Sequence, residues 1–195
     1  MRLILLILLL FPATAHAEGE APFGLHMGMK ISDLQIRVSK EDGVYILQSV
    51  PEPDAKFQQY RVILTGETGV CMVMASGGDV LSTGEGRELK AAFHDVVDDY
   101  SQLYGTPMKQ VGIQYNSNWW KRDDRFMLAL SEKKANMVSM WDQKRNVKVR
   151  GSDFTQIIVQ GFAPNRYRGN VNVLYKFTNY PDCKKILNDK KQVKE

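Results

Sequence analysis

The chain has little of what metal and redox sites are usually built from. It contains two cysteines and three histidines in 195 residues, and one of those histidines, His16, lies in an apolar leader. The other two, His26 and His94, belong to no HExxH or paired Cys/His spacing. The sequence therefore predicts no metal site and no cofactor.

Recognisable catalytic motifs are also missing. There is no GxSxG elbow, and the glycines at 77–78 and 84–86 match neither a phosphate loop nor a dinucleotide fingerprint. The acid pairs Asp98-Asp99 and Asp123-Asp124 are adjacent in sequence, so their side chains diverge and do not form an acid/base couple. His94 lies beside an apolar helix stripe, where a partly buried structural role is expected. We predict no catalytic residue and a non-enzymatic protein.

The chain lacks a strong excess of charge of either sign. Its net charge is +4, or +3 without the first 17 residues, which is too weak to indicate nucleic-acid binding. Basic residues gather at Lys144–Arg150 and Lys184–Lys194. Each run fits a solvated face; the alternative is contact with an anionic envelope component, such as lipid headgroups or polysaccharide.

Only one long apolar run occurs, at Leu3–Phe11, and it is shorter than the roughly 20 residues that span a bilayer. Arg2 precedes it, and Ala15-His16-Ala17 follows as a small-x-small cleavage site. The pattern predicts a signal peptide over 1–17, cleaved between Ala17 and Glu18; an uncleaved membrane anchor is the alternative. We expect a periplasmic or secreted protein without a transmembrane segment in its mature chain.

The two cysteines of the chain, Cys71 and Cys183, both lie outside the predicted signal peptide. An even pair in an exported chain favours a disulfide, which here ties the middle of the chain to its C-terminal part. The alternative is two buried free thiols.

Hydrophobic periodicity predicts three elements clearly. Apolar residues recur at a 3.6-residue period over Arg87–Tyr104, which indicates an amphipathic helix with Leu103 in its stripe. Phe57–Thr65 and Val70–Ala75 form a hairpin whose second strand is apolar on both faces, with Cys71, Val73 and Ala75 on one of them, so it is expected at the centre of a sheet. Thr155–Phe162 and Asn170–Phe177 form a second hairpin.

Weaker patterns complete the prediction. They indicate a short helix at Lys30–Val38, strands at Val44–Val50 and Val111–Tyr115, and a last helix at Asp182–Asp189. Residues 126–141 fit either a hairpin, which we favour, or one helix. The expected fold is α+β, a mostly antiparallel sheet with helices packed on one face, as a single domain over 18–195 with two similar halves, 18–82 and 83–195.

Two short strings resemble known envelope proteins. FGLHMGMKISDL at Phe23–Leu34 and LYGTP at Leu103–Pro107 resemble the opening and the helix end of domains related to the outer-membrane assembly lipoprotein BamE, the SmpA/OmlA group. The same start and helix end, with YKFTN at Tyr175–Asn179 and Cys183, resemble exported proteins of Gram-negative bacteria for which no activity is known. The lipid-bearing cysteine of the lipoproteins is missing here, so the resemblance implies a fold rather than a role.

Two loops combine aromatic and basic side chains, as interaction surfaces do. We predict an interaction surface made of Trp119, Trp120, Lys121, Arg122, Arg166, Tyr167 and Arg168. The alternative is that one of the two tryptophans anchors the core. The leading hypothesis is an envelope interaction module that binds another envelope protein; the sequence specifies neither the partner nor the oligomeric state.

Two other functions remain open from the sequence. One is a small-ligand or enzyme-inhibitor-type binding protein, with a pocket between sheet and helix near His26 and the tryptophans. The other is a hydrolase with an unrecognised site, in which several titratable groups converge in one cleft.

Overall fold

The structure is a computed structural model of the whole chain. It describes residues 21–40, 43–117, 121–145, 149 and 152–192, without the side chains of 109–114. The predicted signal peptide and its cleavage site lie outside the described residues.

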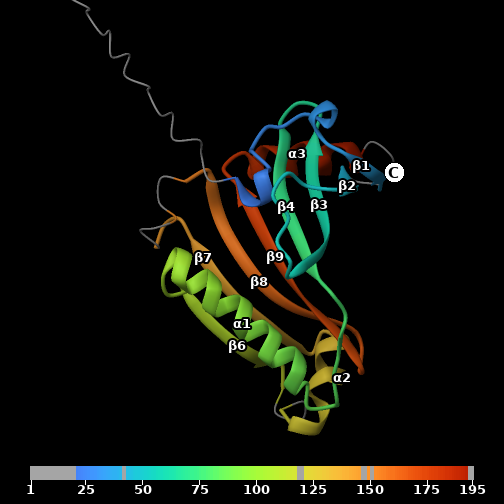
Figure 1. Cartoon of the computed structure of the whole chain (residues 1–195), viewed down its shortest axis with the longest axis vertical. Coiled ribbons are helices and arrows are strands. Elements are labelled where there is room, and N and C mark those ends of the chain that lie inside the picture. The colour runs from blue at the N-terminus through green and yellow to red at the C-terminus, as the bar shows by residue number, and fades with distance from the viewer. Residues whose placement is uncertain (1–20, 41–42, 118–120, 146–148, 150–151, 193–195) are drawn as a thin grey trace, which may run out of the picture.

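The strands form one antiparallel sheet in the order β1-β2-β3-β4-β9-β8-β7-β6, with β5 beside β9 (Figure 1). The chain is therefore α+β, as predicted. The strands are β1 (Ile36–Ser39), β2 (Val44–Leu47), β3 (Phe57–Thr65), β4 (Gly69–Gly77), β5 (Val80–Leu81), β6 (Lys109–Tyr115), β7 (Ala135–Asp142), β8 (Phe154–Asn165) and β9 (Arg168–Phe177). The helices are α1 (Arg87–Tyr104), α2 (Phe126–Ser131) and α3 (Tyr180–Gln192), with 3-10 turns at Pro22–Gly24, Ile31–Asp33 and Asp123–Arg125.

The sheet consists of two meanders that meet at its centre. β1 to β4 run inward from one edge, β6 to β9 run inward from the other, and β4 pairs antiparallel with β9. The second hairpin of the sequence prediction is β8–β9, and the first is β3–β4. The division into similar halves at 18–82 and 83–195 agrees with this strand order and stays a prediction.

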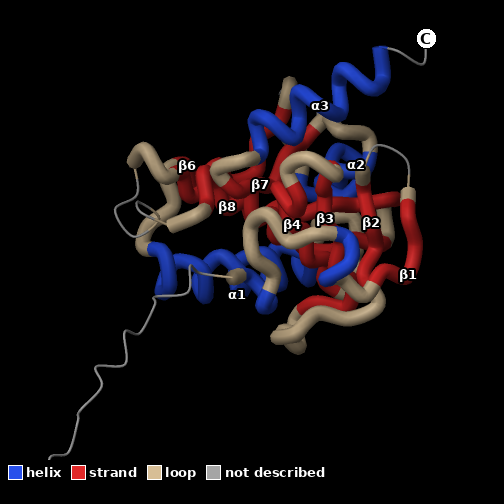
Figure 2. Tube along the Cα trace, turned by 90° about the horizontal axis from the view of Figure 1, so that it is seen from above, coloured by secondary structure: helices blue, strands red, loops and turns tan. Residues whose placement is uncertain are grey.

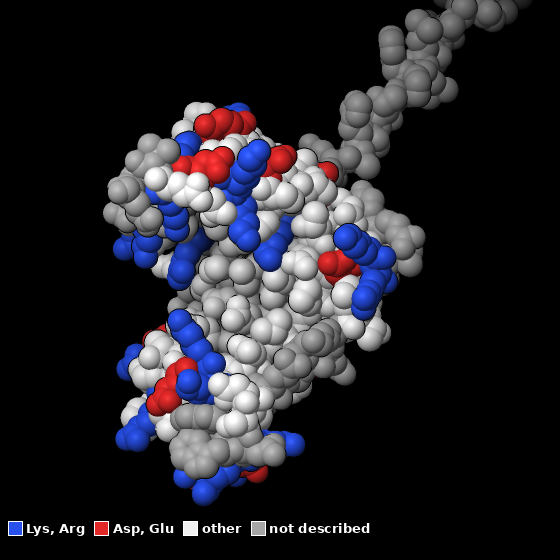
Figure 3. Space-filling view, turned by 180° about the vertical axis from the view of Figure 1, so that it is seen from behind, with Lys and Arg blue, Asp and Glu red and all other residues white. Residues whose placement is uncertain are grey.

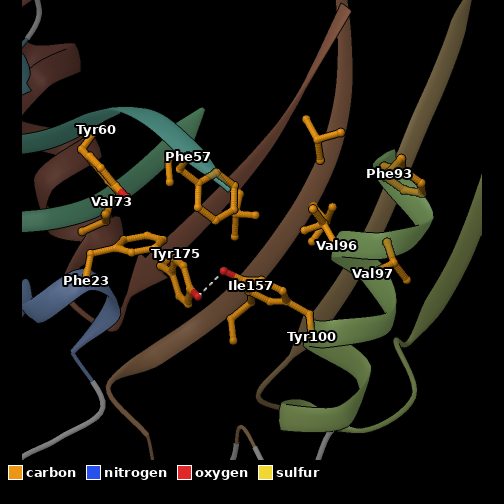
Figure 4. Close-up of a cluster of buried hydrophobic side chains, with 14 of the residues drawn as sticks. Phe23, Phe57, Tyr60, Val73, Phe93, Val96, Val97, Tyr100, Ile157 and Tyr175 are labelled. Carbon is orange, nitrogen blue, oxygen red and sulfur yellow. Dashed lines mark hydrogen bonds between the residues drawn. The ribbon is translucent and has the colours of Figure 1, made fainter. Parts of the chain in front are cut away.

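Helix α1 has the bounds that its periodicity predicts, and it lies on the sheet over β8 and β9. Gly86 caps it with a positive φ, and a side chain there would collide with the ring of Phe126 at the start of α2. The prediction that Leu103 belongs to the buried stripe was wrong, because it lies at the edge of the stripe in the last turn and is 63% exposed. Five stripe residues are buried in the core: Leu89, Phe93, Val96, Val97 and Tyr100. Figure 4 shows the last four of them.

The prediction that all helices pack on one face was also wrong. α1 and α3 lie on opposite sides of the sheet (Figure 2), and the Cys71–Cys183 disulfide joins β4 to α3. α3 is mainly polar, and Cys183 is its one fully buried residue. The predicted disulfide is therefore confirmed, and it connects α3 to the face that α1 leaves open.

A β-bulge decides the direction of Cys71. The β3–β4 register shifts between Ile63 and Leu64, so Val70 and Val73 both join the core on the α1 side, whereas Cys71 reaches α3. The strict alternation that placed Cys71 on the same face as Val73 was therefore wrong. β4 is nevertheless a central strand, because β3 and β9 flank it.

Two weakly predicted segments also differ. Lys30–Val38 is a 3-10 turn followed by β1, because cross-strand pairing with β2 outweighs its weak helical spacing. Residues 126–141 are α2 followed by β7, with Lys133 at positive φ in the turn between them. Neither one hairpin nor one helix was correct, because four of the six residues of α2 are buried without alternation, whereas burial alternates strictly along β7.

Within the part of the chain that the structure describes, no helix combines the length and the apolar character needed to cross a bilayer.

Candidate docking surface

The face of the sheet opposite α1 is only partly covered. α3 contacts β3 and β4 there, whereas the side chains of β7, β8 and β9 on this face are half-exposed. Figure 3 views this face and shows a broad uncharged area, with Lys and Arg gathered above and below it. We call the outward side chains of β4, β9, β8 and β7 the open face.

Strand register arranges the open face in rows that cross the strands. Residues paired across adjacent strands have their side chains on the same face, and successive residues of one strand alternate between faces. One such row is entirely apolar, and all four members are half-exposed. This apolar row consists of Met74, Leu174, Ile158 and Met140.

The row toward α3 is polar and ordered by hydrogen bonds. Lys176, Gln156 and Asp142 are cross-strand neighbours on β9, β8 and β7. Lys176 Nζ donates to Gln156 Oε1 at 3.1 Å, and Gln156 Nε2 donates to Asp142 Oδ2 at 3.4 Å. The oxygen of the Gln156 amide thus faces the Lys176 ammonium and its NH₂ group faces the Asp142 carboxylate, and this fixes the orientation of the amide.

The row on the other side of the apolar row also carries polar groups. Ser76, Asn172 and Gln160 are paired across β4, β9 and β8. Ser76 Oγ and Asn172 Oδ1 are buried and have no hydrogen-bond partner among the described residues. The apolar row is therefore bordered by polar side chains on both sides, charged on one side and neutral on the other, and these two rows end in the apolar Met72 on β4 and Val138 on β7.

The β8–β9 hairpin tip extends the open face with exposed apolar and basic side chains. Arg168 is at an outward position of β9, and Leu81 on β5 pairs with it, so both side chains point to the side of the open face. Phe162 points to the same side, because it lies two positions beyond Gln160 on β8. Leu81 is 66% exposed and Tyr167 is 55% exposed. Large exposed apolar side chains that gather in this way are typical of interaction sites.

Local hydrogen bonds hold the hairpin tip. Asn165 Oδ1 accepts hydrogen bonds from the backbone N–H groups of Tyr167 and Arg168, at 2.9 and 3.0 Å, as in an Asx turn. The Arg166 guanidinium lies 4.6 Å from the Tyr167 ring centroid, and Arg168 Nη1 donates to Asp79 Oδ2 at 3.1 Å. Sequence order and these contacts thus present Arg166, Tyr167 and Arg168 together.

Helix α2, which follows the other predicted loop in the chain, lies at the same end of the molecule as the hairpin tip (Figure 1). The segment 82–84 links the two, because Ser82 N–H donates to Tyr167 O and Met127 N–H donates to Gly84 O. Lys121 is exposed, and the guanidinium of Arg122 makes two hydrogen bonds to Asp124, which lower the pKa of that carboxyl group. Trp119 and Trp120 lie outside the described residues.

An apolar cleft of about 210 Å³ lies on the other side of the sheet, between α1 and the ends of β3, β4 and β9. The predicted pocket between sheet and helix thus has a counterpart, but His26 does not line it. Its apolar lining consists of Phe57, Val80, Ala92, Val96 and Val171, and Lys56 and Asp95 also line it.

The two histidines stand apart from both the open face and the cleft. His26 and His94 are exposed, so the expectation that His94 is partly buried was wrong. Among residues 21–192 as far as they are described, no three His, Cys, Asp or Glu side chains group in a way that suits a metal ion. Trp141 is the tryptophan that the structure places in the core, where its Nε1 donates to Gly105 O at 2.6 Å.

The rows of the open face were not predicted from the sequence. Val171, Val173, Tyr175 and Phe177 alternate along β9 and are buried, whereas the positions between them point to the open face. The sequence did contain one indication of an exposed apolar row: Leu174 and Ile158 are apolar residues at outward positions of two paired strands.

Comparison with protein-family models, with curated proteins and with solved structures found no match to this chain.

Proposed function

We propose that this protein is a non-enzymatic, exported protein that docks another protein of the cell envelope on its open face and hairpin tip. The proposal rests on one observation: four half-buried apolar side chains form a continuous row across the adjacent strands β4, β9, β8 and β7, on the face opposite α1. Leu81, Phe162 and Tyr167 continue the apolar character to the tip.

The composition of the row suits protein binding. Met74 and Met140 have flexible, polarisable side chains that adapt to an incoming surface. Tyr167 and the neighbouring arginines are residue types enriched where interfaces concentrate their binding energy. The polar rows on both sides supply hydrogen-bonding groups for the rim of such an interface.

Export supports an envelope partner. The leader over 1–17 and the disulfide both fit an oxidising compartment outside the cytoplasm, with the periplasm as the proposed location.

The test is photo-crosslinking in living cells. A photoreactive phenylalanine analogue at Ile158 or Phe162 is expected to form one discrete protein adduct, and the same analogue at exposed His94, on the outer face of α1, is expected to form none. Adding Leu174→Asp to the Phe162 probe should abolish the adduct, because a charge in the apolar row removes burial energy. An adduct from His94 alone, or one that survives Leu174→Asp, would show that the open face is not the docking surface.

The apolar cleft supports a second candidate, a small-ligand binding protein. Its lining is mainly apolar with two charged side chains, as ligand sites commonly are. Val171→Trp should fill the cleft; if that variant keeps its fold and its crosslinks but loses a ligand that co-purifies with the wild type, the cleft is the functional site.

A further inference from the structure

Lys176 is a half-buried cation on the open face whose close partners are neutral. Its ammonium donates to the Gln156 amide and lies 5.3 Å from the Tyr180 ring centroid. No carboxylate of the described residues lies within ion-pair distance of it. The nearest acid in its row, Asp142, is separated from it by the Gln156 amide.

A second cation lies beside it. Tyr180 and Lys184 are four residues apart on α3 and so share a helix face. The pKa of Lys176 is lowered by partial desolvation and by the charge of Lys184. Both effects disfavour the ammonium ion, and the attraction of an anion placed between the two lysines would offset them.

The neighbourhood specifies what kind of anion fits. Met72 and the apolar row flank Lys176 on the sheet, so the anionic group must belong to a ligand that also buries apolar surface. A free inorganic ion supplies the negative charge but buries no apolar surface. A protein segment that carries an acidic side chain next to apolar side chains supplies both.

We propose that Lys176, assisted by Lys184, binds a carboxylate of the docked partner, and that the partner segment places apolar side chains on the row formed by Met74, Leu174, Ile158 and Met140. This inference rests on the proposed function and adds the chemistry of the partner. Asp142, two strands away in the same row, carries the opposite charge, so the partner segment is expected to bind with its carboxylate at the Lys176 end of the row. Specificity therefore comes from one charge beside an apolar row.

The test uses two peptides with the purified protein: acetyl-Leu-Leu-Glu-Leu-Leu-amide and its Gln counterpart. Methyl signals of ¹³C-methionine report on Met74 and Met140, and side-chain signals of ¹³C-lysine report on Lys176. We expect both peptides to shift the methionine signals and the Glu peptide to bind about tenfold more tightly. In Lys176→Gln, the Glu peptide should fall to the affinity of the Gln peptide.

Controls separate a specific contact from general attraction. Lys185→Gln removes the same charge from an exposed position next to Lys184 and should leave both affinities unchanged. Unchanged thermal midpoints should show that the variants fold. A loss in Lys185→Gln equal to that in Lys176→Gln would overturn the inference in favour of net charge.

The remaining outcomes are decisive in different ways. Equal binding of both peptides would refute the carboxylate contact and leave the docking surface standing. No methionine shift with either peptide would overturn both proposals. Binding to vesicles containing phosphatidylglycerol that disappears in Lys176→Gln, without peptide binding, would assign the site to lipid headgroups instead.

Discussion

Removing the Cys71–Cys183 disulfide is expected to destabilise the protein and to release α3 before the rest of the fold. The two cysteines are 112 residues apart in sequence. In the chain-entropy description, a loop of that length contributes about 4.8 kcal/mol at 25 °C, and measured values for native disulfides are typically about 2–4 kcal/mol. Cys71→Ala/Cys183→Ala should therefore lower the free energy of unfolding by about 2–5 kcal/mol.

The local effect follows from how α3 is attached. Its other attachments include Asn179 Nδ2, which donates to Thr68 O and Val70 O, the half-buried Leu187 side chain beside Gly43, and an exposed Lys190–Glu67 ion pair of the kind that contributes little. An isolated helix of 13 residues is marginal in water. Without the disulfide, the amides of α3 should exchange with solvent nearly as fast as an unfolded peptide, whereas the amides of β8 and β9 stay protected.

The assay is urea unfolding followed by circular dichroism, together with hydrogen exchange by mass spectrometry. With a slope of about 2 kcal/mol per molar urea, the midpoint should fall by about 1–2.5 M. Reduction of the wild type should reproduce this shift, and the same reductant should leave the double alanine variant unchanged. A loss below about 1 kcal/mol, or an α3 that remains protected, would refute the idea that the disulfide is its main attachment.

Two further predictions concern the core and its turns. Gly69→Ala should destabilise by about 2–4 kcal/mol in thermal or urea unfolding, because Gly69 has a positive φ and a methyl group there would collide with the backbone of Gly28; Gly66→Ala, with no atom within 4 Å of the added carbon, should change stability by less than about 0.5 kcal/mol. Burial raises the pKa of Tyr100 and Tyr175, whose hydroxyls share a 2.6 Å hydrogen bond (Figure 4), so the unfolded chain loses these protons first as pH rises. The free energy of unfolding should therefore fall above about pH 10, by up to about 1.4 kcal/mol per pH unit for each group. An unfolding series from pH 9 to 11 whose slope is the same in Tyr100→Phe/Tyr175→Phe would contradict this.

Strong local patterns predicted their elements well. The 3.6-residue period of Arg87–Tyr104 and the alternation in β9 each repeat over several turns or residues, so that one misplaced side chain, such as Leu103, does not alter the element. Lys30–Val38 has too few apolar positions for a reliable period, and pairing between Ile36 and Leu47 decided its conformation.

The candidate site was predictable only in part. Arg166, Tyr167 and Arg168 are adjacent in sequence, so their shared location follows from the chain itself. The apolar row joins four strands from positions 74 to 174, and no local pattern shows that these residues are neighbours. The same holds for Lys176, because its neutral partners, Gln156 and Tyr180, come from another strand and from the next helix.

The sequence by itself determined the α+β class, the long helix and the two central hairpins, because these depend on the periodicity of nearby residues. It also pointed to the cysteine pair, because two cysteines in a chain that is predicted to be exported favour one disulfide. Tertiary structure alone decided that α3 lies opposite α1, that the bulge turns Cys71 toward it, and that four distant residues form one apolar row. These features depend on strand register and on contacts between segments far apart in the chain, which no local pattern encodes.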